Sequence, residues 1–173
     1  MTLPPNPSRV ENAARKVRCL VLDVDGVMTD GRILYMPGGG ETKAFHVRDG
    51  LGIKMLMHSG VHVAILSGRE SEAVNRRAAE LGIEHLIQGI DDKVAAFENV
   101  LSRLDLPAED TAYVGDDLPD LPLLKRVGLG FAPADASPEV RAAAHVVLRA
   151  GGGQGAVREA CELILRAKGA WTV

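Results

Sequence analysis

Short apolar runs alternate with helical patterns along most of this 173-residue chain. The apolar runs span residues 19–22, 61–66, 111–114 and 127–131, and the helical patterns span residues 52–59, 71–81, 93–104 and 118–125. Continuous apolar runs suit strands that are buried on both faces, and strands that alternate with helices are typical of parallel sheets. The sequence therefore predicts an α/β fold with a parallel sheet.

One segment interrupts this alternation directly after the first apolar run. Residues 31–36 and 41–46 have strand patterns and flank Pro37 and three glycines, so they predict a β-hairpin inserted over residues 31–46. A surface hairpin without a role and an element for specificity or assembly are both open. An exposed hairpin edge can pair with another chain unless it is covered, which favours assembly.

The length of the chain fits one domain over residues 1–173, because single domains cluster at ~100–200 residues. Residues 1–12 contain three prolines and no long apolar segment, so we expect them to be disordered and not to be a signal peptide. Residues 150–173 begin with a glycine-rich stretch, and a helix is predicted over residues 156–168.

Composition and charge exclude several classes of partner. The net charge of −3 gives no basic footprint for nucleic acid, and an aromatic content of 3% is too low for a base-stacking surface. No segment approaches the ~20 apolar residues that a membrane-spanning helix needs. Cys19 and Cys161 lie in an apolar run and a helical pattern, which favours reduced, buried thiols. We expect a cytoplasmic protein that binds neither nucleic acid nor a membrane.

Polar residues follow the predicted strands at the points where the strands end. They are Asp23 and Asp25 after the first strand, Ser67, Gly68 and Arg69 after the second, Asp116 and Asp117 after the third, and Lys93 at the start of the helix before that third strand. In an open parallel sheet, ligands bind beyond the carboxyl ends of the strands. We therefore expect these residues to meet at one edge of the sheet.

The carboxylates among these residues predict a magnesium site. Asp23 and Asp25 are two positions apart, so an extended backbone points their side chains the same way. Two carboxylates held close together repel each other, and a divalent cation relieves this repulsion. Hard oxygen ligands favour Mg²⁺, which binds one or two carboxylates, waters and a phosphate oxygen. Asp116 supplies the further carboxylate that such a site needs.

The same residues suit phosphoryl transfer. One carboxylate can act as a nucleophile, and its neighbour can protonate the leaving oxygen and later activate water. Ser67 and Lys93 can balance the charge that spreads over the phosphoryl group. Each residue alone has an ordinary explanation, such as a solvated turn or a helix cap. Their combination, each at a strand end, indicates a phosphatase.

These motifs resemble those of the haloacid dehalogenase superfamily, namely Leu22-Asp23-Val24-Asp25-Gly26, then Ser67, Lys93 and Gly115-Asp116-Asp117 with Asp120. Stretches 23–31, 45–50, 115–120 and 152–159 resemble more closely one family, the 3-deoxy-D-manno-octulosonate 8-phosphate phosphatases. The resemblance implies a capless, Rossmann-like three-layer parallel sheet. It implies a Mg²⁺-dependent phosphomonoesterase that forms a phospho-aspartate and serves the synthesis of lipopolysaccharide precursors. It also implies a homotetramer in which hairpins of neighbouring subunits close the site and the glycine-rich tail reaches an adjacent one.

The resemblance further implies roles for individual residues. Asp23 is the nucleophile and a magnesium ligand, Asp25 is the acid/base and lends its backbone carbonyl to the metal, and Asp116 is the remaining protein ligand. Two supporting acids and two phosphoryl-binding residues complete the set: Asp117, Asp120, Ser67 and Lys93. The residues expected to line the substrate pocket are His46, Val47, Arg48, Asp49, Gly50, Lys54, Gly68, Arg69 and Arg77.

Two arginines have a chemical rationale of their own, because Arg69 and Arg77 can grip the carboxylate of a sugar acid through paired hydrogen bonds. Without the resemblance, Arg77 reads as an exposed helix residue. The chain has His46, Lys54 and Gln154 where the family often has Asn, Arg and Arg.

These departures keep a phosphatase of a nine-carbon keto-sugar acid phosphate open as an alternative. A non-catalytic assembly module of the same fold is a second alternative, although such a module would be free to lose its acids. A signalling receiver that accepts a phosphoryl group is a third, which the order of the motifs disfavours.

Overall fold

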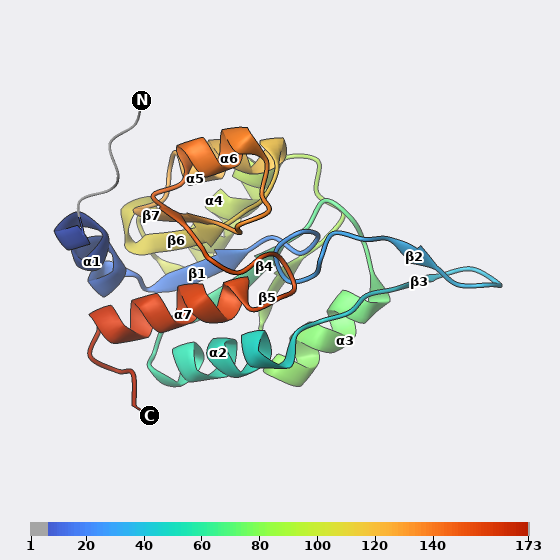
Figure 1. Cartoon of the computed structure of the whole chain (residues 1–173), viewed down its shortest axis with the longest axis horizontal. Helices are drawn as coiled ribbons and strands as arrows, with labels where there is room; N and C mark the ends of the chain where they lie inside the picture. Colours follow the sequence, from blue (N-terminus) through green and yellow to red (C-terminus); the bar gives the residue numbers. More distant parts are fainter. Residues whose placement is uncertain (1–6, 173) are drawn as a thin grey trace.

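The computed structural model describes residues 7–172 and contains a six-stranded sheet in which neighbouring strands run parallel (Figure 1). The order of the strands across the sheet is β5-β4-β1-β6-β7-β8. Their bounds are β1 Cys19–Leu22, β4 His62–Leu66, β5 His85–Ile87, β6 Thr111–Val114, β7 Leu129–Ala132 and β8 Val146–Val147.

Strand β1 lies in the middle of the sheet, where the order of the strands reverses. Leu22 is in register with Ile65 of β4 on one side and with Val114 of β6 on the other. All residues of β1 are buried, which explains why the strand is a continuous apolar run. The point between β1 and β6 is the topological switch point at which open α/β sheets bind ligands.

Helices cover both faces of this sheet (Figure 1). One face carries α1 (Pro7–Lys16), α2 (Val47–His58), α3 (Glu72–Leu81) and α7 (Ala156–Ala167), and the other carries α4 (Lys93–Leu104), α5 (Leu121–Leu124) and α6 (Pro138–Ala143). Leu20 and Leu22 belong to the first core cluster, and Cys19 and Val21 to the second, because successive side chains of a strand point to opposite faces. The predicted α/β class and three-layer parallel sheet are confirmed.

Most predicted elements are present with shifted ends. The predicted helix 118–125 is divided into a 3₁₀ helix, η2 (Leu118–Asp120), and α5, and another 3₁₀ helix, η1 (Ala108–Asp110), precedes β6. The predicted helix 52–59 begins earlier, because Nδ1 of His46 accepts a hydrogen bond from the Arg48 amide at 3.2 Å and caps α2. The sequence patterns do not predict β5, β8 and α6, since these elements are too short to show a period.

Helix α1 corrects the expectation that residues 1–12 are disordered. Residues from Pro7 onward are helical, and a proline is tolerated in the first turn of a helix. Val10, Ala13 and Ala14 recur at the spacing of one helix face and pack against the core on the α7 side of the sheet. Burial of this face stabilises a helix that would be marginal alone. Residues 1–6 lie outside the described part of the chain.

The hairpin is present but shorter than predicted. Its strands, β2 (Leu34–Tyr35) and β3 (Glu41–Thr42), form a separate antiparallel pair that projects from the body of the molecule (Figure 1). Three glycines at its tip, residues 38–40, have φ between +85° and +99°, a conformation that glycine adopts without strain. Four apolar side chains in and next to β2 are exposed: Ile33, Leu34, Tyr35 and Met36.

The glycine-rich segment 151–155 packs against the loop that follows β1 in the same chain. The amide of Gly153 donates to the carbonyl oxygen of Val27 at 3.0 Å, and a Cβ on Gly152 would lie 1.9 Å from the carbonyl oxygen of Gly26. Helix α7 follows at Ala156, close to the predicted bounds. The segment thus supports the loop after β1 of its own chain.

Two further expectations concern the thiols and the membrane. Cys19 and Cys161 are both free and buried, and burial raises the pKa of Cys19 to about 12. Among residues 7–172, no helix combines the length and the apolar character that crossing a membrane requires.

Candidate active site

The predicted catalytic residues meet at the carboxyl ends of β1 and β6. Asp23 directly follows β1, and its amide donates to the carbonyl oxygen of Val114 in β6 at 3.1 Å. Its side chain is 9% exposed. Asp116 follows β6 after one glycine. Because β1 and β6 are neighbours, the topology brings together residues that are far apart in the sequence.

Lys93 links two carboxylates at this edge. Its Nζ donates to Oδ1 of Asp23 at 2.7 Å and to Oδ1 of Asp120 at 2.6 Å. The lysine opens helix α4, where the Asp92 carboxylate accepts hydrogen bonds from two amides of the first turn. Burial lowers the pKa of Lys93, but the two carboxylates raise it more, so the net pKa lies above the ordinary value. The ammonium group therefore stays charged.

Asp120 holds the loop after β6 in shape. Its Oδ1 also accepts from the hydroxyl of Tyr113 at 2.6 Å, and its Oδ2 accepts from the amides of Asp116 at 2.9 Å and Asp117 at 3.2 Å. Asp117 is exposed and caps η2 by accepting from the amide that follows it. The two acids expected to support the metal thus differ: Asp120 is buried at the site, whereas Asp117 shapes the loop from its surface.

Asp116 is packed against the tight turn after Asp25. A Cβ on Gly26, whose φ is +86°, would lie 2.0 Å from Oδ2 of Asp116. Burial, reinforced by the Asp23 and Asp120 carboxylates, raises the pKa of Asp116 to about 7. Burial also raises the pKa of Asp23 to about 6, although Lys93 counteracts this rise. Both shifts arise mainly because the two carboxylates are withdrawn from solvent, and neighbouring acids add to them.

This cluster fits a hard divalent cation. Carboxylate oxygens of Asp23, Asp116 and Asp120 lie within 4.8 Å of one another. Asp120 accepts hydrogen bonds at both of its oxygens, so Asp23 and Asp116 are the carboxylates best suited to bind metal. A cation between them would favour the charged forms that burial disfavours, and an all-oxygen ligand set favours Mg²⁺.

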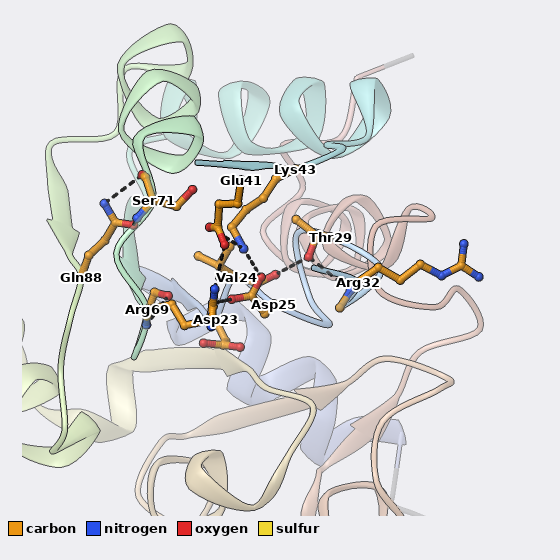
Figure 2. Close-up of polar contacts among 12 residues, drawn as sticks. Asp23, Val24, Asp25, Thr29, Arg32, Glu41, Lys43, Arg69, Ser71 and Gln88 are labelled. Atoms are coloured by element: carbon orange, nitrogen blue, oxygen red, sulfur yellow. Dashed lines mark hydrogen bonds and ion pairs between the residues drawn. The ribbon is translucent and has the colours of Figure 1, made fainter. Parts of the chain in front are cut away.

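Asp25 belongs to a second charged network, which joins the active-site loop to the base of the hairpin (Figure 2). Its Oδ1 accepts a hydrogen bond from Nζ of Lys43, and its Oδ2 lies 3.8 Å from Nε of Arg69. Glu41 contacts both cations, at 3.4 Å from Nζ of Lys43 and 2.7 Å from a terminal nitrogen of Arg69. The hydrogen bond from Arg69 lowers the pKa of Glu41.

Ser67 lies at the same edge of the sheet, at the end of β4. Its side chain is buried, and its Oγ accepts a hydrogen bond from the amide of Arg69 at 3.2 Å. A Cβ on Gly68 would lie 3.4 Å from the carbonyl oxygen of Ile90, which is an ordinary van der Waals contact. The hydroxyl follows β4, the neighbour of the strand that ends before Asp23.

The other residues predicted to line the substrate pocket gather around the start of α2. Val47, Arg48 and Lys54 are exposed, while His46 caps the helix. Arg77 of α3 donates to the carbonyl oxygen of His46 at 3.5 Å. Within residues 7–172, no hydrogen bond or ion pair joins this group to Asp23 or Asp25, so its part in substrate binding stays a prediction.

Asp49 also contacts a helix outside this group. It is 3% exposed, and its Oδ1 accepts a hydrogen bond from the amide of Arg158 in the first turn of α7 at 2.8 Å. Helix α7 begins after Gly155, which has no side chain to cap it, so Asp49 supplies the missing acceptor. Burial raises the pKa of Asp49. Its side chain thus anchors α7 through Oδ1, and Asp49 also lines a small cavity with His46, Gly50 and Arg77, so its contact with substrate stays a prediction.

Three residues of these networks escape prediction from the sequence: Glu41, Lys43 and Tyr113. Glu41 and Lys43 alternate along an extended segment, so they share one side of the chain, but this pattern also suits a solvated strand face. Tyr113 lies inside a buried strand, where a phenolic hydroxyl needs a hydrogen-bond partner. That requirement points to a nearby polar group without identifying Asp120.

Comparisons with known proteins agree with this geometry. Residues 86–157 match the family model described as haloacid dehalogenase-like hydrolase. The 3-deoxy-D-manno-octulosonate 8-phosphate phosphatase of Escherichia coli strain K12 is 49% identical over 156 residues, which cover 90% of this chain and 83% of that protein.

Solved structures show the same similarity. The crystal structure of 3-deoxy-D-manno-octulosonate 8-phosphate phosphatase from Yersinia pestis superposes with a TM-score of 0.92 at 48% identity and covers 94% of this chain and 88% of that one. The enzyme of the same name from Moraxella catarrhalis has a TM-score of 0.93 at 43% identity and covers 95% and 94%. That structure is a complex with magnesium, phosphate and the eight-carbon sugar acid.

Proposed function

The chain belongs to the 3-deoxy-D-manno-octulosonate 8-phosphate phosphatase family of haloacid dehalogenase-like hydrolases, and we propose on this basis how its residues release phosphate from that substrate. The protein is a phosphomonoesterase that hydrolyses 3-deoxy-D-manno-octulosonate 8-phosphate to the free sugar acid and phosphate, with Mg²⁺ as cofactor. The observation that carries the mechanism is the Lys93 ammonium, which holds the Asp23 and Asp120 carboxylates beside Asp116 at the switch point of the sheet.

The carboxylates of Asp23 and Asp116 would bind magnesium, with the backbone carbonyl of Asp25 as a further ligand. When bound, the ion neutralises the phosphate oxygens and lets an anionic nucleophile approach an anionic substrate. The raised pKa values of Asp23 and Asp116 support this assignment, because burial of these carboxylates makes their charged forms costly and a bound cation would offset that cost.

Asp23 acts as the nucleophile. One of its carboxylate oxygens forms a bond to phosphorus while the bond from phosphorus to the sugar oxygen breaks, which leaves a phospho-aspartate on Asp23. Asp25 gives its proton to the departing sugar oxygen. Asp25 then takes a proton from a water molecule that attacks phosphorus, and phosphate leaves as Asp23 is regenerated. Lys93 and Ser67 balance the charge on the phosphoryl oxygens in both steps.

Recognition of the sugar acid falls to the arginines and to the start of α2. Arg69 is half exposed, lies beside Asp25 and is in reach of a leaving group at that carboxylate. His46, Arg48 and Lys54 belong to α2 or its cap, Arg77 contacts the backbone of His46, and we assign these residues to the distal part of the sugar acid. A nine-carbon keto-sugar acid phosphate remains the competing substrate, because both acids carry a carboxylate.

Assembly and cellular context complete the proposal. The hairpin exposes Ile33, Leu34, Tyr35 and Met36, an apolar surface of the kind that another subunit covers, and we propose a homotetramer built on it. Free, buried cysteines fit a reducing compartment, and we propose that the enzyme works in the cytoplasm in the synthesis of lipopolysaccharide precursors.

A substrate panel tests the proposed activity. Purified protein with Mg²⁺ is assayed for phosphate release from the eight-carbon and nine-carbon keto-sugar acid phosphates and from simple sugar phosphates. We expect a clear preference for the eight-carbon acid and loss of at least ~1,000-fold in rate for Asp23→Asn, which keeps the shape of the side chain but removes the nucleophile. Equal rates across the panel would reduce the assignment to generic phosphatase chemistry, and turnover by Asp23→Asn would exclude the proposed mechanism.

A further inference from the structure

Lys43 is a buried lysine that the mechanism described above does not use. Its side chain is 2% exposed, although an ammonium group in a protein interior is costly unless anions pair with it. Two carboxylates do so, since Nζ donates to Oδ1 of Asp25 and lies 3.4 Å from Oε1 of Glu41. Unlike an exposed surface lysine, Lys43 therefore does not contribute to solubility, and its contacts with the two carboxylates define its role.

The contact with Asp25 fixes the orientation of that carboxylate. Asp25 stands on a loop, where its side chain would otherwise be free to rotate, and it is the only acid of the Asp23–Asp25 pair that Lys43 contacts among the described residues. With Oδ1 held by Lys43, Oδ2 is turned toward Arg69 at 3.8 Å (Figure 2). The side chain of Asp25 keeps 22% exposure, so it remains accessible from the site.

Glu41 secures Lys43 from the hairpin. Glu41 and Lys43 are two positions apart in an extended segment, so both side chains point to the same side. Glu41 also pairs with Arg69, whose side chain is 43% exposed and can turn toward an incoming anion. Lys43 has no such freedom. The two cations therefore differ. Lys43 is held against Asp25, whereas Arg69 can leave its carboxylate partners to bind an incoming anion.

We propose that Lys43 is a positioning residue, which holds the side chain of Asp25 where its acid form can give a proton to the leaving oxygen and the resulting carboxylate can later take a proton from water. This inference rests on the proposed function. Lys43 does not contact Asp23, Lys93 or Asp120, which form the separate network around the nucleophile. Loss of Lys43 therefore impairs proton transfer and leaves the attack on phosphorus intact.

Leaving groups that differ in their need for a proton distinguish these two steps. When the bond from phosphorus to a sugar oxygen breaks, that oxygen must receive the proton of Asp25. A nitrophenolate departs without a proton. With p-nitrophenyl phosphate, a Lys43→Met enzyme should form the phospho-aspartate at a rate within about fivefold of wild type, then hydrolyse it slowly, because the second step needs Asp25 as a base.

The experiment is rapid-mixing kinetics on wild type, Lys43→Met, Lys43→Arg and the control Lys16→Met, an exposed lysine at the end of α1. For Lys43→Met we expect a burst of nitrophenolate near one equivalent per active site, and a fall of about 100-fold in the first turnover of the sugar acid phosphate. Lys43→Arg should recover much of the lost rate, because it restores the cation. Lys16→Met should match wild type on both substrates.

Each other outcome counts against the inference. Equal losses on both substrates mean that Lys43 supports the site as a whole, and no loss means that Asp25 needs no support. If Lys43→Met does not fold, the double variant Lys43→Met with Glu41→Gln removes one of the two carboxylates that lose their lysine partner, and its comparison with Glu41→Gln alone must show the same selective loss. Absence of phosphate release by wild type would instead refute the proposed function.

Discussion

Gly26 and Asp116 are so close that a Cβ at position 26 would lie 2.0 Å from Oδ2 of Asp116 and would displace that carboxylate. The glycine also has a φ of +86°, which disfavours side chains for a separate reason. The turn after Asp25 and the carboxylate after β6 are thus fitted to each other. This fit keeps Asp116 next to Asp23 and defines the place for the metal.

Gly26→Ala should therefore destroy activity beyond what backbone strain explains. Gly60 has the same φ of +86° with nothing within 4 Å of a Cβ, so Gly60→Ala is a matched control for strain alone. Both variants should lose about 1–3 kcal/mol of unfolding free energy from the conformation. We expect phosphate release to fall at least ~100-fold only for Gly26→Ala, and similar activity in both variants would show that Asp116 can move aside at no cost.

Asp116→Asn should stabilise the metal-free protein at alkaline pH. The pKa of Asp116 rises from 3.8 to about 7 on folding, so the folded state holds its proton more tightly than the unfolded state. This preference stabilises the protein fully below about pH 4 and is lost as pH rises through about 7. Since the amide is never charged, the variant should exceed wild type by about 1–3 kcal/mol at pH 8, with a much smaller difference at pH 5.

Urea unfolding in the presence of a chelator measures this effect. The fluorescence of Trp171, whose ring contacts the guanidinium groups of Arg158 and Arg166, monitors the unfolding. Asp91→Asn, at an exposed carboxylate, is the control and should match wild type at both pH values. A variant that gains nothing at pH 8 would mean that Asp116 is ordinarily acidic in the folded protein.

Binding of magnesium should stabilise the folded protein, because the cation offsets the negative charge of Asp116 and its neighbours. At pH 8 we expect Mg²⁺ to raise the midpoint of thermal unfolding of wild type by several degrees, since a ligand of the folded state stabilises it by mass action. Asp116→Asn should show little response, and so should wild type with sodium at equal ionic strength. Removal of the metal by a chelator should also stop phosphate release. An equal rise in the variant would place the metal elsewhere.

Asp49 should matter for stability more than for substrate affinity. Asp49→Ala leaves the amide of Arg158 without its buried acceptor, which costs about 1–3 kcal/mol, whereas Asp49→Asn keeps an oxygen there and should cost less. Urea unfolding measures the first effect, and the KM for the sugar acid phosphate measures the alternative. If Asp49→Ala unfolds like wild type but has a raised KM, the residue contacts substrate after all.

The catalytic set is the part of the site that the sequence predicts well. Asp23, Ser67 and Asp116 each follow an apolar run, and the rule that parallel strands end at one edge is enough to bring them together. No distance is needed for that step, because the alternation of strands and helices already determines the direction of every strand.

The supporting contacts are not predictable in the same way. Asp49 and Arg158 are 109 positions apart, and nothing in either segment indicates that one carboxylate will cap the other helix. The short helix α1 has only one apolar face, so its stability depends on the core that it covers. Its proline-containing sequence alone suggests disorder.

The apolar pattern and the order of the polar residues thus determined the sheet, its ligand-binding edge and the phosphatase chemistry, because burial of apolar strands follows local periodicity. Only the tertiary structure decided that Lys43 is buried against Asp25, that Asp49 anchors α7 and that the glycine-rich segment packs on its own active-site loop. Charged and glycine residues suit solvent as well as the interior, and the surrounding fold decides which of the two has the lower free energy.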